Sequence, residues 1–245
     1  MKNSSFFKDS ETIEFLDLES SFEFSCSGCG GCCRNNEGHI LTGYDVYRIA
    51  KCLGISITEA IDRYLRWDFR KYDPIIPTVL MGKRENGTCS LFDSDSGECV
   101  VHARKPISCA ILPLNMSFDY EDRTILYTLM GESKMPSGCG GGSKCQSLKD
   151  WIEKYAISEN DPDILSWYIT LLELMDDPLI ETFRTSDVHS ITGNKIAVAR
   201  DTVRNLLEDA LYREYNTDEP FRGQITAKME KVFIEMKHIR EKFGI

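Results

Sequence analysis

Apolar residues recur every three or four positions in three stretches of the C-terminal half of the chain. This spacing places them along one face of a helix in each stretch. The three faces are Leu165, Tyr168, Leu171, Leu172 and Met175; Val203, Leu206, Leu207, Ala210 and Leu211; and Met229, Val232, Phe233, Met236 and Ile239. Residues 148–245 are therefore predicted to form a helical unit. Core packing explains its methionine-containing faces better than a partner groove does. A partner protein is nevertheless expected on this unit.

The N-terminal half predicts shorter helices. Thr42 opens a helix-start pattern, apolar residues follow it with helical spacing, and Gly54 is a natural stop. Ser56 begins a second helix by the same logic, with an apolar face that extends toward Trp67. A third, short helix is expected after Pro106 because proline suits the first turn of a helix.

Short strand patterns lie between and after these helices. Residues 78–81, 88–92 and 98–101 are predicted strands, joined by two turns into a small antiparallel sheet. Residues 115–118 and 124–130 predict a β-hairpin. The whole pattern predicts an α+β fold, in which a small cysteine-rich antiparallel sheet with short helices is followed by a helical C-terminal unit.

Three regions follow from this pattern. Residues 1–24 are interpreted as an acidic N-terminal arm, residues 25–147 as a cysteine-cluster domain, and residues 148–245 as the helical unit. A chain of 245 residues with 42% hydrophobic content can bury an ordinary core, which excludes a disordered protein. The cysteine-rich and helical regions could share that core.

The net charge of −10 argues against a general binder of the nucleic-acid backbone, and no nucleic-acid partner is expected. The two helices after Thr42 could suggest a helix-turn-helix DNA reader, but acidic residues offset the arginines of the second helix. No apolar run reaches the roughly 20 residues of a transmembrane helix, and residues 1–24 lack the apolar stretch of a signal peptide. A cytoplasmic protein is expected.

The densest chemistry lies in the run Cys26-x-x-Cys29-x-x-Cys32-Cys33. Glycine and serine fill its gaps, so the run is predicted to be a loop. Short Cys-x-x-Cys steps let neighbouring thiolates turn onto one metal ion. In a reducing compartment such clusters bind metal or do redox chemistry more often than they form structural disulfides, which are the alternative here.

Four further cysteines lie at turns or on short elements downstream, which gives eight candidate ligands in all. The candidates are Cys26, Cys29, Cys32, Cys33, Cys89, Cys99, Cys109 and Cys139. Eight thiolates suit two four-ligand sites or one polynuclear cluster, of zinc or of iron and sulfur such as a 4Fe–4S cluster. Because adjacent side chains diverge, Cys32 and Cys33 favour a site with more than one metal atom.

Other residues near the cluster have less defined roles. Cys52 is interpreted as a structural thiol on a helix, whereas Cys145, His39 and His102 stay open as further ligands. Basic residues close to the candidate ligands could donate hydrogen bonds to the sulfur atoms or lie free in solvent. They are Arg34, Arg104, Lys105 and Lys144.

Residues 24–145 resemble the YkgJ-like cysteine-cluster proteins, also described as zinc- or iron-chelating domains. The resemblance rests on the CxxCxxCC run and on the basic-Pro-x-x-Cys segment that ends at Cys109. It implies metal ligation by the eight cysteines named above. The family's segment usually continues with arginine after this cysteine, and Ala110 stands there in this chain.

Three functions are compatible with these features. The chain could be a metal-binding accessory or interaction module, an electron-transfer protein, or a protein-modifying enzyme. The enzyme hypothesis comes from the related flagellin lysine N-methylases, which attach this domain to a methylating activity. No glycine-rich cofactor loop and no catalytic triad can be assembled from the sequence, so enzymatic activity is left undecided.

Overall fold

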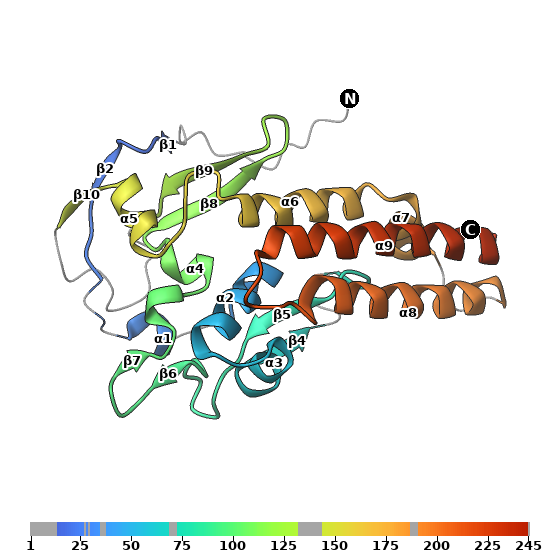
Figure 1. Cartoon of the computed structure of the whole chain (residues 1–245), viewed down its shortest axis with the longest axis horizontal. Helices are drawn as coiled ribbons and strands as arrows, with labels where there is room; N and C mark the ends of the chain where they lie inside the picture. The colour runs from blue at the N-terminus through green and yellow to red at the C-terminus, as the bar shows by residue number, and fades with distance from the viewer. Residues whose placement is uncertain are drawn as a thin grey trace.

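The computed structural model describes residues 14–26, 28, 30–34, 38–68, 73–131, 144–186 and 191–244 of the chain. It confirms the α+β class: small antiparallel sheets and short helices come first, and long helices follow (Figure 1). Residues 1–13 of the predicted acidic arm lie outside the described residues.

The C-terminal region is helical, as predicted. Its helices are α5 (Leu148–Lys154), α6 (Pro162–Met175), α7 (Pro178–Thr185), α8 (Ile191–Tyr212) and α9 (Phe221–Phe243). Helices α6, α8 and α9 lie side by side along the long axis of the molecule (Figure 1). Among the described helices, none combines the length and the apolar character needed to cross a membrane.

The predicted apolar faces of α8 and α9 pack into the core, whereas the predicted face of α6 packs only in part, with Leu165, Tyr168 and Leu171 half-buried against it. The buried residues of α6 are Ile164, Trp167, Thr170 and Leu174, whereas Met175 is 51% exposed. The helix is thus rotated by about one position from the expected orientation. Trp167 explains the rotation, because its buried indole ring packs directly on Gly43. In the expected orientation this large ring would not be buried in the core.

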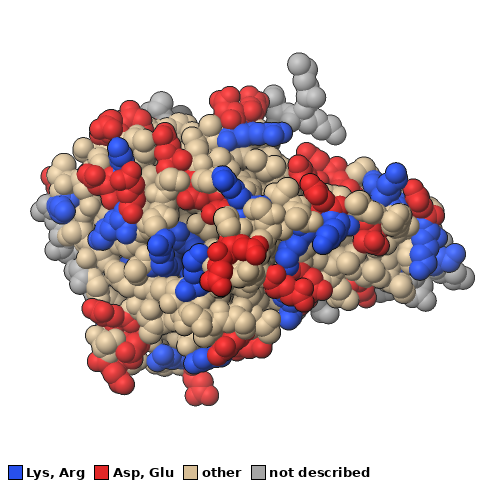
Figure 2. Space-filling model, viewed as in Figure 1, with Lys and Arg blue, Asp and Glu red and all other residues tan. Residues whose placement is uncertain are grey.

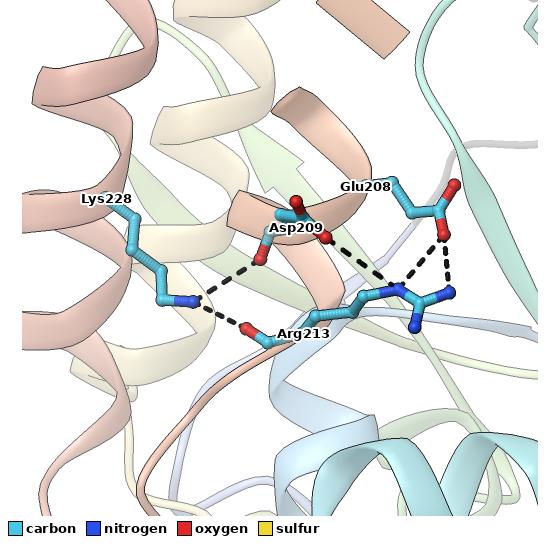
Figure 3. Close-up of polar contacts among 4 residues, drawn as sticks. All are labelled: Glu208, Asp209, Arg213 and Lys228. Atoms are coloured by element: carbon cyan, nitrogen blue, oxygen red, sulfur yellow. Dashed lines mark hydrogen bonds and ion pairs between the residues drawn. The ribbon is translucent and has the colours of Figure 1, made fainter. Parts of the chain in front are cut away.

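A lysine side chain from α9 satisfies carbonyl groups at the end of α8, and an arginine just beyond α8 pairs with a carboxylate of that helix (Figure 3). The Lys228 ammonium on α9 donates hydrogen bonds to the carbonyl oxygens of Asp209, at 3.3 Å, and Arg213, at 2.5 Å. Arg213 in turn pairs with the carboxylate of Glu208, with Nη2 and Oε1 2.6 Å apart. These contacts cap the C-terminal end of α8 and fix it against α9.

The two predicted N-terminal helices are present as α2 (Gly43–Leu53) and α3 (Ile57–Tyr64). The Thr42 hydroxyl and the Asp45 carboxylate form a capping box at the start of α2, and Gly54 ends it at φ 65°. The expected extension of α3 to Trp67 is wrong, because β4 (Leu65–Asp68) starts directly after Tyr64.

Tertiary contacts account for this early end of α3. Strand β4 pairs with β5 (Thr78–Met81), and the other edge of β5 pairs with β3 (Ile40–Leu41). The Trp67 ring also packs edge-on against Tyr212 of α8, with 5.6 Å between centroids. Pairing and burial outweigh the helical pattern at these positions.

The predicted three-stranded sheet of residues 78–101 is divided between two sheets. Strand β5 belongs to the β3–β5–β4 sheet, whereas β6 (Phe92–Asp93) and β7 (Glu98–Cys99) form a separate hairpin. Of the strand expected at 88–92, only Phe92 is in a strand, and Cys89 makes a single bridge with Lys83. The turn at Asn86 and Gly87 forms, but the chain leaves the sheet after it.

The predicted hairpin is present as β8 (Leu114–Asp119) and β9 (Thr124–Leu129). Strand β1 (Phe15–Leu16) adds to the free edge of β9, and β2 (Ser21–Glu23) pairs with β10 (Cys145–Ser147). Side chains in and just after β2 are anchored as well: the rings of Phe22 and Phe24 pack edge-on against Trp151, with centroids 6.2 Å and 5.5 Å away.

One hydrophobic core connects the cysteine-rich and helical regions through α2. The first eight residues of α2 are buried. The hydroxyl of Tyr47 on α2 donates to the carbonyl oxygen of Glu219, at 2.7 Å, and Tyr212 of α8 donates to Leu41, at 3.1 Å. The surface is mixed in charge, and Figure 2 shows acidic and basic side chains interspersed on one face.

Candidate metal site

Six cysteine side chains line a single cavity of about 280 Å³. They come from four segments of the chain, and each is a free thiol. The six are Cys26, Cys32, Cys33, Cys89, Cys99 and Cys109. Their elements lie together at the end of the molecule opposite the C-terminus, where Figure 1 shows α1 (Gly31–Arg34), α4 (Ile107–Ala110) and the β6–β7 hairpin.

The short helix α1 brings two adjacent thiols together. The sulfur atoms of Cys32 and Cys33 are 3.9 Å apart. Two thiolates bound to one tetrahedral zinc, each at about 2.3 Å, would be about 3.8 Å apart. The side chains therefore do not diverge as expected, and this pair has the spacing of two ligands on one ion.

Gly30 makes the start of α1 possible. Its backbone has φ +67°, and a Cβ atom added there would come within 2.7 Å of the Phe92 ring. Its carbonyl oxygen accepts hydrogen bonds from the backbone N–H groups of Cys33 and Arg34, at 3.0 and 2.9 Å. Gly30 therefore has two roles: it adopts the positive φ that the turn requires, and it leaves room for the Phe92 ring.

Backbone hydrogen bonds bring Cys89 and Cys99 to this helix. The N–H of Cys89 donates to the carbonyl oxygen of Cys33, at 2.8 Å. The β6–β7 hairpin places Cys99 directly opposite Phe92, whose ring forms part of the cavity wall. The turn at residues 94–97 reverses the chain and thereby brings Cys99 back to the site.

Helix α4 carries Cys109, and α2 holds α4 in place. One carboxylate oxygen of Asp45 accepts a hydrogen bond from the N–H of Ile107, at 2.6 Å. The other accepts from the Thr42 backbone and hydroxyl, at 2.9 and 2.8 Å. Because Asp45 is buried, desolvation raises the pKa of its carboxyl group in spite of these donors.

The surroundings of three cavity thiols favour their neutral form. The hydrogen bond with Cys32, then burial, raises the pKa of Cys33. Burial raises the pKa of Cys99 to about 11 and also raises that of Cys109, and nearby thiols add to the effect. A bound cation would reverse this preference, because it stabilises the thiolate forms.

Among the described residues, no group of three or more Cys, His, Asp or Glu side chains is arranged to hold a metal ion. The cavity gathers the described donors within one space. Their chemistry fits a thiophilic ion, since soft thiolate ligands select zinc, copper(I) or iron–sulfur clusters.

The remaining candidates are distributed unevenly. His102 lines the cavity, and burial lowers the pKa of its imidazole. His39 lines a second cavity, of about 350 Å³, on the other side of α4. Cys52 is half-buried on α2 and Cys145 is exposed on β10, and neither lines the thiol cavity. Two predicted ligands, Cys29 and Cys139, lie outside the described residues.

The basic residues near the cysteines also differ in position. Lys105 is 8% exposed and lines the cavity. Arg34 is exposed, with its guanidinium 5.4 Å from the centroid of the Phe92 ring, and Arg104 and Lys144 are exposed. Sequence reasoning missed Arg48, whose buried guanidinium supports the segment around Lys105. The available signal in the sequence was an arginine inside the otherwise apolar run of residues 46–50.

Residues 25–139 match the family model "CxxCxxCC: Putative zinc- or iron-chelating domain". This match confirms the family resemblance that the cysteine spacing carried. No curated protein and no solved structure matches the chain.

Proposed function

Because residues 25–139 match the CxxCxxCC zinc- or iron-chelating domain, we propose that this chain binds zinc or an iron–sulfur cluster through clustered cysteine thiolates. The observation that carries the proposal is the convergence of six thiols from four segments on one cavity. Sulfur ligands of this number in one place have no role in ordinary core packing, and they suit a thiophilic metal.

The proposed ligands are the six cysteines of the cavity together with Cys29 and Cys139. Cys29 is proposed because it belongs to the same short run as Cys26 and Cys32 and because the family resemblance implies it. Cys139 is proposed on the family resemblance alone. His102 is a reserve nitrogen ligand, because its imidazole is neutral and faces the same space.

Eight thiolates correspond to two tetrahedral sites or to a polynuclear centre. The 3.9 Å sulfur–sulfur spacing of Cys32 and Cys33 allows both on one ion. The preference for several metal atoms therefore rests on the number of thiols and not on the adjacency of this pair. When bound, zinc would cross-link the four segments, and an iron–sulfur cluster would add one-electron transfer.

We propose that the metal centre serves an accessory, interaction or electron-transfer module in the cytoplasm. The eight described cysteines are free thiols, which suits a reducing compartment. The helical region is the proposed surface for a partner protein. The alternative, an enzyme similar to the flagellin lysine N-methylases, has no specific support in the described residues, whose sheets are small and antiparallel.

Metal and acid-labile sulfide analysis of anaerobically purified protein tests the proposal. Stoichiometric zinc without sulfide, or iron with sulfide and a visible absorption band, is the expected result. A band that bleaches reversibly with dithionite would assign electron transfer. Protein that contains neither metal, and that takes up neither after reconstitution, would contradict the proposal. Tight binding of S-adenosylmethionine in calorimetry would instead favour the enzyme.

A further inference from the structure

A buried ammonium group faces the thiols of the cavity. Lys105 is only 8% exposed, although lysine is almost never buried without a partner. Burial by itself lowers the pKa of Lys105, but interactions with Tyr155 and with three cavity thiols outweigh it, and the pKa is raised. The three thiols are those of Cys26, Cys32 and Cys109. The protein thus keeps a cation where sulfur ligands converge.

The second partner of this ammonium is Tyr155, just beyond the end of α5. The Lys105 nitrogen is 5.0 Å from the centroid of the tyrosine ring, within the range of a cation–π interaction. The tyrosine hydroxyl is buried and has no hydrogen-bond partner among the described residues. Such a hydroxyl is costly for a protein that leaves it unpaired.

Arg48 holds both residues in position. Its Nε donates to the carbonyl oxygen of Lys105 at 3.3 Å, and its Nη2 donates to that of Tyr155 at 2.7 Å. A third bond, from Nη1, reaches the carbonyl oxygen of Ala156 at 3.3 Å. The buried guanidinium therefore ties the loop before α4 to the end of α5, and it fixes the distance between the ammonium and the ring.

We infer that Lys105 and Tyr155 form a positioning pair that compensates the negative charge of a metal–thiolate centre, with Arg48 fixing the pair. This inference rests on the proposed function. Four thiolates around a divalent ion carry more negative charge than the ion neutralises, and a cluster ligated by thiolates is also anionic. A buried ammonium offsets that excess, and ammonium and hydroxyl groups can both donate hydrogen bonds to sulfur.

Other cations nearby lack this combination of features and provide controls. Lys154 lies over the same tyrosine ring, 5.3 Å from its centroid, but its side chain is exposed. Arg104 is adjacent to Lys105 in sequence and is also exposed. Neither lines the thiol cavity. Removal of either charge tests whether any positive charge at this distance has the same effect.

The test compares zinc affinity and metal-free stability in Lys105→Met, Lys105→Arg and Lys154→Met. Anaerobic titration against a chromophoric chelator should show binding weakened by about 10- to 100-fold in Lys105→Met. Lys105→Arg should retain most of the affinity, and Lys154→Met should bind like the wild type. The melting temperature of metal-free Lys105→Met should fall less than that of the zinc-loaded variant, because the metal-free cavity lacks the anionic centre that the ammonium offsets.

Tyr155→Phe supplies an independent variant that removes only the unpaired hydroxyl. Its zinc affinity should fall by a smaller factor, while the metal-free protein should be at least as stable as the wild type. A parallel loss of metal-free stability and affinity in both variants would mean a merely structural role and would overturn the inference. Wild-type affinity in Lys105→Met would also overturn it and leave the proposed function standing. A wild-type protein that binds no metal overturns both.

Discussion

At the scale of single residues, Cys32 and Cys33 show how much local backbone geometry decides. Adjacent residues in an extended chain point to opposite sides, but on the single turn of α1 the two sulfur atoms are 3.9 Å apart. Gly30 makes that turn possible through its positive φ and its contact with Phe92. A pair that looked unsuited to one ion has the spacing of two ligands.

Replacement of Cys32 by serine tests this arrangement. The variant should lose metal, because Cys32 lines the thiol cavity and its sulfur atom lies 3.9 Å from that of Cys33. Elemental analysis of protein purified without oxygen measures the change. Cys52→Ser is the matched control, since Cys52 is a half-buried thiol outside the cavity and should leave the metal content unchanged. Full metal content in Cys32→Ser would place the centre elsewhere.

At the scale of elements, α2 does more than the sequence pattern indicates. Its first turn closes a capping box, and the same aspartate reaches across to the N–H of Ile107 at the start of α4. Its middle turn presents Arg48 to the carbonyl oxygens of Lys105 and Tyr155. One helix therefore positions both the segment that carries Cys109 and the buried cation beside it.

Removal of the Asp45 carboxylate should damage both the helix and the metal site. Asp45→Ala leaves the Ile107 N–H and the Thr42 backbone N–H without their partner, so we expect unfolding free energy to fall by about 2–4 kcal/mol. Metal affinity should fall as well, because α4 loses its anchor. Urea denaturation and zinc titration measure the two effects.

Glu59→Ala is the matched control, because Glu59 occupies the same third position of α3. Its carboxylate makes an exposed ion pair with Arg63 at 2.8 Å, which contributes little to stability. We expect a change below about 1 kcal/mol and unaltered metal affinity. Equal losses in the two variants would contradict the special role of Asp45.

At the scale of the whole molecule, the cysteine-rich and helical regions meet at Gly43. A Cβ atom added there would clash with the carbonyl oxygen of Leu211 on α8 and come within 2.6 Å of the Trp167 ring on α6. Three helices far apart in sequence thus converge on one residue without a side chain. Since one core spans both regions, we expect the chain to unfold in a single cooperative transition.

Gly43→Ala should destabilise the protein strongly, because the new methyl group must displace backbone. Overpacking of this kind costs about 1–3 kcal/mol, and the rigid carbonyl places this site at the upper end. Gly223→Ala is the matched control, since Gly223 lies inside α9 with nothing within 4 Å of an added Cβ. It should raise stability by up to about 1 kcal/mol. Thermal melts of both variants measure the difference; a neutral Gly43→Ala would contradict the close packing of α2, α6 and α8.

Metal removal should affect the whole molecule as well. On the proposed function, bound metal would cross-link segments around residues 26–33, 89, 99 and 109 and would contribute directly to folding free energy. A chelator should therefore lower the melting temperature, and restored zinc or iron should recover it. Because the core is shared, the helical region should melt at the lowered temperature too. A melting curve that is insensitive to chelator, in protein shown to hold metal, would contradict this coupling.

The sequence was sufficient wherever a few neighbouring residues carry the information. The capping box at Thr42, the stop at Gly54 and the hairpin of residues 114–129 depend on local hydrogen bonding and backbone preference, and all are present. The metal-binding pattern of the CxxCxxCC run also depends only on neighbouring residues, and the match to a zinc- or iron-chelating domain supports it.

Only the tertiary structure decided the features that depend on distant partners. Strand β4 replaces the end of a helix because β5 and Tyr212 offer pairing and burial there. The face of α6 is set by the fit of Trp167 onto Gly43. The convergence of thiols and the burial of Lys105 depend on contacts between segments up to about one hundred residues apart. The hydrophobic periodicity of the sequence predicts local secondary structure and carries no information about such contacts. The sequence alone identified the candidate ligands, and three-dimensional packing determined which of the described ones share a cavity.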